Sequence, residues 1–190
     1  MTANQINNVM NKCFKLLSGI VAVAGIVSMV SCKDNENYAG VWKSKTPADI
    51  TAKMPMTANV SVVTTLELQK NQQQTDGIVR LSDSYNISEK DSVGNIIPIS
   101  AVATVDGTWQ PDVDDHDDLL MTFNMSSIKI DVNGDSARVA TWRPEIERVF
   151  RENITRYSVI EDIDIKDNGK LMSLEINNPD TKLFFDRVQP

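Results

Sequence analysis

The chain has 190 residues, of which 41% are hydrophobic and 24% charged, and its formal net charge is −7 at pH 7. This length allows one domain with a sizeable core and is too short for two comfortable ones. An acidic chain repels phosphate groups, so the composition argues against nucleic acid and anionic membrane surfaces as partners.

The first 31 residues have the composition of a secretory signal peptide. Lys12 and Lys15 are their only charged residues, and the run that follows, up to Val30, holds only two serines among apolar residues and glycines. This run is shorter than the ~20 apolar residues that a membrane-spanning helix needs. We therefore expect residues 1–31 to be removed, which leaves a mature chain with a net charge of −9.

Cys32 follows the apolar run directly and precedes a polar segment, Lys33–Asn37. This arrangement resembles the signal of a bacterial lipoprotein. The resemblance implies cleavage before Cys32 and attachment of acyl chains such as palmitate, and two or three chains give stable anchoring where one gives only marginal binding. A buried or disulfide-bonded Cys32 is the alternative. Because Cys13 leaves with the signal, the mature domain has no second thiol and must rest on packing alone.

The acidic segment after Cys32 resembles the export tether of surface lipoproteins in the Bacteroides group, in which an early acidic cluster accompanies transfer to the outer leaflet. We expect residues 32–39 to form this lipidated acidic tether and residues 40–190 to form a single domain. The expected location is the outer membrane with the domain at the cell surface. A periplasm-facing domain is the alternative.

Alternation of apolar and polar residues dominates the mature chain and predicts antiparallel strands with one buried face. Around residues 60–69 the apolar positions are Val60, Val62, Leu66 and Leu68. The same pattern recurs over residues 119–125 and 128–132.

Turn residues predict how these strands are joined. Asn133-Gly134 predicts a hairpin between residues 128–132 and 138–142, and Asn168-Gly169 predicts another before residues 171–176. Gly94-Asn95 predicts a third.

One segment departs from alternation. After Pro144, which a first helical turn tolerates, apolar residues recur at steps of three and four as far as Tyr157. We expect one amphipathic helix over about 144–157, with its apolar face covering or plugging the sheet.

Two Gly-x-Trp motifs open expected strands, at Gly40 to Trp42 and at Gly107 to Trp109, and Arg187 lies in the last expected strand. The first motif and Arg187 resemble lipocalin-like domains, and more closely the small lipocalin-like lipoproteins of the Bacteroides group. The resemblance implies an antiparallel up-and-down barrel or strongly curved sheet with one helix. It also implies that Gly40, Trp42 and Arg187 close one end of the barrel, with ~0.5–2 kcal/mol of cation–π attraction between arginine and indole.

Acidic residues gather over residues 112–118 beside the only histidine, His116. Calcium takes six to eight oxygens, so the weak candidates for a metal site are Asp112, Asp114, Asp115, Asp117 and Asp118. The segment lacks the glycine that an organised calcium loop needs at its sixth position, and one histidine cannot make a zinc site. We therefore expect a solvated acidic loop and no metal.

No motif in the sequence indicates catalysis. There is no Gly-x-Ser-x-Gly elbow, no phosphate-binding glycine loop and no nucleophilic cysteine. The acidic residues between Glu161 and Asp167 are expected on a solvated strand surface. We expect no catalytic residue and no cofactor, with an acid-dependent hydrolase as the least favoured reading.

Two serines lie in short motifs that resemble glycosylation sites. Asp91-Ser92-Val93 and Asp135-Ser136-Ala137 resemble sites at which Bacteroides-group bacteria glycosylate secreted proteins. The resemblance implies O-glycosylation at Ser92 and Ser136. Ordinary turn serines are the alternative.

Two functions follow as expectations. The first is a lipid-anchored, non-catalytic module that binds a small apolar or amphipathic ligand in the barrel. The second is a structural or interaction lipoprotein that binds an envelope protein or a glycan. Its core would be filled by Met121, Phe123, Met125, Phe184 and Phe185. A lined void of several hundred Å³ favours the first.

Replacing Cys32 by alanine tests the anchor. Without an acyl acceptor the protein should leave the membrane fraction, while the fold of residues 40–190 stays intact because no disulfide is lost. Fractionation of cells and thermal unfolding of the released protein measure the two effects. Retention in the membrane, or loss of the fold, would contradict the assignment.

Overall fold

A computed structural model describes residues 38–54, 58–71, 76–112, 118–176 and 181–188. The expected signal peptide, Cys32 and all but the last two residues of the expected tether lie outside these ranges. His116 lies outside them too, as do three of the candidate metal ligands, Asp114, Asp115 and Asp117.

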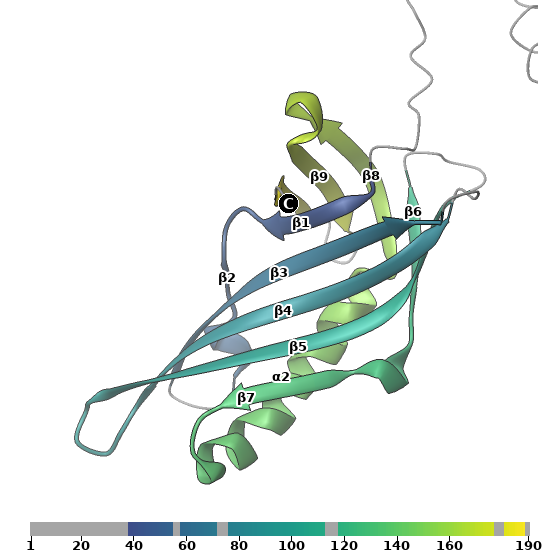
Figure 1. Cartoon of the computed structure of the whole chain (residues 1–190). Helices are drawn as coiled ribbons and strands as arrows, with labels where there is room; N and C mark the ends of the chain where they lie inside the picture. Colours follow the sequence, from purple (N-terminus) through teal and green to yellow (C-terminus); the bar gives the residue numbers. More distant parts are fainter. Residues whose placement is uncertain (1–37, 55–57, 72–75, 113–117, 177–180, 189–190) are drawn as a thin grey trace, which may run out of the picture. The chain divides into compact units, whose positions relative to one another are not determined.

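The described chain is mainly β with one α-helix (Figure 1). The strands are β1 (Gly40–Ser44), β2 (Ala48–Asp49), β3 (Ala58–Lys70), β4 (Gly77–Lys90), β5 (Ile96–Pro111), β6 (Leu119–Phe123), β7 (Lys129–Asn133), β8 (Val159–Lys166), β9 (Leu171–Ile176) and β10 (Thr181–Arg187). The helix α2 (Ser136–Arg156) follows β7. Three short 3-10 helices complete the order, η2 (Thr51–Lys53), η3 (Met125–Ser127) and η4 (Asp167–Gly169).

Eight strands close an antiparallel barrel, which confirms the expected fold class. The ring runs through β1, β3, β4, β5, β6, β8, β9 and β10, and the pairing of β10 with β1 completes it. Successive strands of the ring are neighbours, so the connection is up-and-down. The short strands β2 and β7 pair with β3 and β5 respectively.

The three longest strands, β3, β4 and β5, supply much of the core. Their buried and exposed residues alternate, as expected for strands with one wet face. Val60, Val62, Leu66 and Leu68 are all buried, which confirms the predicted inner face of β3. Burying such side chains stabilises the fold by roughly 1.5–3 kcal/mol each.

The helix is longer than the sequence pattern predicted. It begins at Ser136, eight residues before the expected start, so the strand expected over residues 138–142 is wrong. Asp135 caps it by accepting a hydrogen bond from the Arg138 N–H at 3.0 Å. Asn133-Gly134 therefore links β7 to the helix instead of turning a hairpin.

Trp142 explains why the early turns of α2 are helical. Its side chain is fully buried, and its Nε1–H donates to Glu89 Oε2 on β4 at 3.2 Å. A helical stripe places it in line with the buried Ile146, Val149 and Phe150. One face of α2 is thus packed against the inner side of the long strands (Figure 1).

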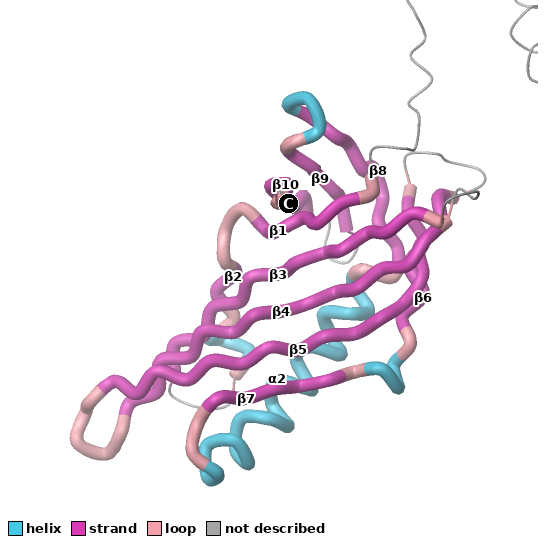
Figure 2. The backbone as a smooth tube through the Cα atoms, viewed as in Figure 1, coloured by secondary structure: helices cyan, strands magenta, loops and turns pink. Residues whose placement is uncertain are grey.

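The other two predicted turns are confirmed. Asn168 and Gly169 adopt positive φ angles between β8 and β9, and the β4–β5 hairpin turns through Gly94 at φ +91°. In the second turn the Asp91 carboxylate accepts hydrogen bonds from the N–H groups of Val93 and Asn95. This hairpin reaches beyond the neighbouring strands (Figure 2).

Two of the five residues expected to fill the core are on the surface. Met125 lies in η3 and is 41% exposed, and Phe184 on β10 is 43% exposed. Met121 and Phe185 are buried as expected, and Phe123 is partly buried. Within the described ranges, no helix is long and apolar enough to cross a membrane.

Replacing Pro144 by alanine should stabilise the protein. Pro144 lies inside α2 and is exposed, so its ring removes a helical hydrogen bond without contributing buried surface. We expect the free energy of unfolding to rise by about 1–3 kcal/mol. Urea unfolding measures it. A loss of stability would show that the proline shapes the helix in a way the rest of the fold needs.

Candidate ligand-binding site

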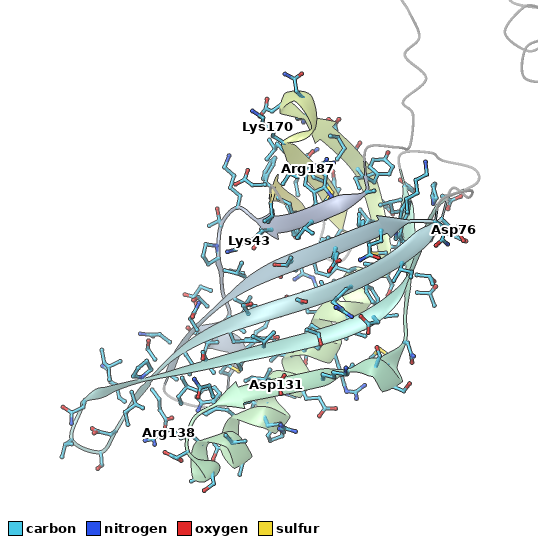
Figure 3. All side chains as sticks on the ribbon, viewed as in Figure 1. Lys43, Asp76, Asp131, Arg138, Lys170 and Arg187 are labelled. Atoms are coloured by element: carbon cyan, nitrogen blue, oxygen red, sulfur yellow. The ribbon has the colours of Figure 1, made fainter. Side chains whose placement is uncertain are left out.

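The first Gly-x-Trp motif and Arg187 meet where β1 lies beside β10. Trp42 is fully buried, and the guanidinium carbon of Arg187 lies 4.5 Å from the centre of its ring. Figure 3 labels Arg187 close to β1. Trp42 Nε1–H donates to the Tyr38 carbonyl at 2.8 Å, and Arg187 Nη2 donates to the Ala39 carbonyl at 3.1 Å. Gly40 has a φ of +151°, and a Cβ there would lie 3.4 Å from the guanidinium carbon. The structure therefore brings the three predicted residues together.

The second Gly-x-Trp motif lies at the same end of the barrel. Trp109 on β5 is buried and pairs with Gly77, the first residue of β4. Its Nε1–H donates to the Gln69 carbonyl at 3.1 Å. A Cβ on Gly77 would lie 1.8 Å from that carbonyl oxygen, so only glycine fits beneath the indole. Two tryptophans thus fill this end.

A cavity of about 340 Å³ opens where β1 separates from β3. The last pair between these strands is Lys43 with Thr65, and pairing with β3 resumes only at Ala48 with Val62. The intervening segment curves away and leaves the Thr64 N–H without a strand partner. The Ser44 hydroxyl accepts that N–H at 3.1 Å. The gap between β1 and β3 is therefore a stable feature of the fold, because the Thr64 N–H that loses its strand partner is hydrogen-bonded to Ser44 instead.

A buried carboxylate lies at the bottom of this cavity. Asp83 on β4 is 1% exposed and accepts three hydrogen bonds. Thr64 Oγ1–H donates to its Oδ1 at 2.7 Å, and Asn153 Nδ2 and the Tyr85 hydroxyl donate to its Oδ2 at 2.8 and 3.3 Å. Asn153 belongs to α2, so this network ties the helix to the inside of the barrel. The Tyr157 hydroxyl lies close to Thr64 and lines the same cavity.

The same burial sets the protonation of these groups. Removal from water raises the pKa of Asp83, and the three donated hydrogen bonds offset part of that effect. Burial, together with the nearby Asp83 carboxylate, also raises the pKa of the Tyr85 and Tyr157 hydroxyls. Both tyrosines are therefore neutral hydrogen-bonding groups over the physiological range.

The walls of the cavity combine apolar side chains with cations. Ile50, Val62, Val149 and Phe185 are buried along it. The more exposed lining residues are Ser44, Lys45, Thr46, Lys53, Arg156, Lys182, Leu183 and Phe184. Because the buried groups lie inside and the exposed ones surround them, the cavity has a wet, basic mouth and a mostly apolar interior.

Several predicted site residues do not join this cavity. Ser92 is exposed in the β4–β5 turn, and Ser136 is exposed as the first residue of α2. Asp112 and Asp118 close the base of the acidic loop, where the Asp112 N–H donates to the Asp118 carbonyl at 3.0 Å. Over the described ranges, no three His, Cys, Asp or Glu side chains gather as a metal site.

Sequence reasoning missed the polar residues of the cavity, although two signals mark them. Asp83 occupies an inward position in the alternation of β4, between Leu81 and Tyr85, where an apolar residue is the rule. Asn153 lies on the stripe of α2 that also presents Val149 and leads to Tyr157, the residue that caps the helix. A polar residue at an inward position of an apolar pattern is therefore the signal that could have identified the site.

Comparison with known proteins does not extend this picture. No protein-family model matches the chain, and no match to a curated protein is found. The functional argument therefore rests on the residues of the cavity.

Replacing Asp83 by asparagine tests the protonation of the buried carboxyl. Its pKa is raised on folding, so its contribution to stability is full below the unfolded value of about 4 and is lost as the pH rises through the folded value. The stability of the wild type relative to Asp83→Asn should therefore fall as the pH rises above about 4. Urea unfolding at constant ionic strength measures it.

The matched control is Asp131→Asn, which changes an exposed aspartate on β7 (Figure 3). Its stability should run parallel to that of the wild type over the same pH range. A wild-type advantage over Asp83→Asn that grows with pH would show that the three donors hold Asp83 as a favoured anion.

Proposed function

We propose that this chain is a lipid-anchored cell-envelope protein whose barrel binds a small amphipathic molecule without catalysing a reaction. The observation that carries the proposal is the cavity of about 340 Å³ beside Asp83. Ligand pockets span roughly 300–1,000 Å³ and combine apolar walls with a few placed polar groups, and this cavity has both properties.

The cost of the buried network supports a binding role. A carboxylate taken out of water is expensive even when it is hydrogen-bonded, and apolar residues would stabilise this interior better. Asp83 and its partners are also not needed to close the barrel, because Trp42 and Trp109 fill the other end. Polar groups retained beside an open cavity are what recognition of a ligand requires.

The sequence supports the location. The apolar run before Cys32 and the acidic segment after it resemble a lipoprotein signal and a Bacteroides-group surface tether. We place the domain at the outer membrane, facing outward, held by acyl chains on Cys32. In that place it would meet small molecules before they enter the cell.

One observation favours the second candidate, an interaction lipoprotein. The β4–β5 hairpin extends past the neighbouring strands (Figure 2). At its tip, Val93 is 80% exposed and Ile96 is 65% exposed. Apolar side chains on a projecting hairpin suit contact with an envelope protein or a glycan. The two roles are compatible, because the tip residues Val93 and Ile96 do not line the cavity.

Native mass spectrometry of the mature lipoprotein, purified from its own envelope in mild detergent, tests the ligand. We expect an added mass of a small molecule on the wild type. Leu183→Trp should lower the fraction of protein that carries this mass. Leu183 is a half-buried residue of the cavity wall, and the larger indole ring would occupy part of the cavity.

The matched control is Ile78→Trp, which adds the same ring at an outward, 50% exposed position of β4. This variant should keep the wild-type occupancy. Absence of any added mass from every wild-type preparation would count against a binding module. Equal loss in both variants would show that the ring disturbs folding instead of the cavity.

A further inference from the structure

Four cations surround the cavity, although the chain as a whole carries a net charge of −7. They come from four separate parts of the fold. Lys45 follows β1, Lys53 ends η2, Arg156 ends α2 and Lys182 lies in β10. A local gathering of positive charge in an acidic protein attracts anions to that place and not to the rest of the surface.

The fold holds these cations at the mouth. The Lys45 N–H donates to the Phe184 carbonyl at 2.9 Å, which fixes the curved segment against β10. Arg148 Nη2 on α2 donates to the Lys53 carbonyl at 2.7 Å, which fixes η2 against the helix. Among the described residues, Lys182 is the one of the four with a carboxylate close by, Asp162 at 3.5 Å, and that pair is exposed to solvent.

Arg156 is the cation among these four that has a buried donor without a partner among the described residues. Its Nε is buried and has no hydrogen-bond partner within the described part of the chain. Asp83 lines the same cavity, but it takes its hydrogen bonds from three neutral groups and forms no ion pair with Arg156. This buried Nε–H of a half-buried arginine is therefore left without a protein acceptor in the described chain, although buried donors are almost always satisfied.

We propose that the cavity binds an amphipathic organic anion, and that Arg156 binds its charged end. This inference rests on the proposed function and names the chemical class of the ligand. A planar guanidinium matches a carboxylate with two parallel hydrogen bonds, and Lys45 and Lys53 add charge at the mouth. The apolar part of the ligand lies along Val62 and Val149.

The same geometry disfavours a cationic ligand. Such a group would need an accessible carboxylate, whereas Asp83 is only 1% exposed and both of its oxygens accept hydrogen bonds from protein donors. It would also pass the four cations at the mouth. A neutral ligand would leave the charge of Arg156 without a counter-charge in the cavity.

Titration calorimetry of the mature lipoprotein in phosphatidylcholine nanodiscs tests the assignment, with empty nanodiscs as the blank. The probes share an eight-carbon chain and differ in charge: octanoate, 1-octanol and octyltrimethylammonium. We expect octanoate to bind at least tenfold more tightly than the other two. Arg156→Gln should weaken octanoate at least tenfold and leave 1-octanol unchanged.

The matched control is Arg151→Gln on the same helix. Arg151 is exposed, pairs with Glu147 and lies outside this cavity. The Arg151→Gln variant should bind octanoate with an affinity within twofold of that of the wild type. Thermal unfolding of each variant checks the fold, because a role of Arg156 limited to stabilising the helix end would lower the melting temperature without changing selectivity among probes.

The outcomes separate this inference from the function beneath it. If 1-octanol binds as tightly as octanoate and Leu183→Trp abolishes both, the cavity binds ligands but the anion assignment is overturned. Unchanged octanoate affinity in Arg156→Gln also overturns it. If no probe binds the wild type at millimolar concentration, both the anion assignment and the proposed function fail. If Arg156→Gln does not fold, the selectivity of the wild type among the three probes decides.

Discussion

The closure of the barrel through β1 is the constraint on which the rest of the structure depends. This five-residue strand pairs with β3 on one side and with β10 on the other, so it alone joins the two ends of the sheet. Trp42 fills the space beneath it, and Arg187 lies across the indole. Just past Trp42 the strand leaves β3, and the cavity begins there. The same short strand therefore completes the barrel and, where it separates from β3, forms the edge of the cavity.

The second organising element is the buried contact between α2 and β4. Asn153 on the helix donates to Asp83 on the strand, and nearer the start of the helix Trp142 donates to Glu89 on the same strand. These two contacts fix the rotation of the helix about its axis. Because Arg156 lies three residues after Asn153, that rotation also directs Arg156 towards the cavity. The hydrogen bond between Asn153 and the buried Asp83 thus also helps to place Arg156 at the cavity.

The sequence predicts the strands well because alternation reflects which face is buried, and Asn-Gly and Gly-Asn pairs mark turns at Gly94 and Gly169. It misleads at Asn133-Gly134, since the same pair precedes Asp135, whose side chain caps a helix. It also misses the bulge in β8, where Asp162 at φ +49° brings Ile160 and Ile163 into the core three residues apart. The cavity depends on the residue at which β1 separates from β3. The sequence does not reveal this point, because the alternation within one strand does not specify its register with the neighbouring strand.

A crystal structure of the protein purified from its native envelope tests the central claim most directly, because it shows the content of the cavity. The account predicts electron density for a small non-protein molecule beside Val149, with its acidic end within hydrogen-bond distance of Arg156. A cavity that holds only ordered water, with Arg156 turned into solvent, would contradict it.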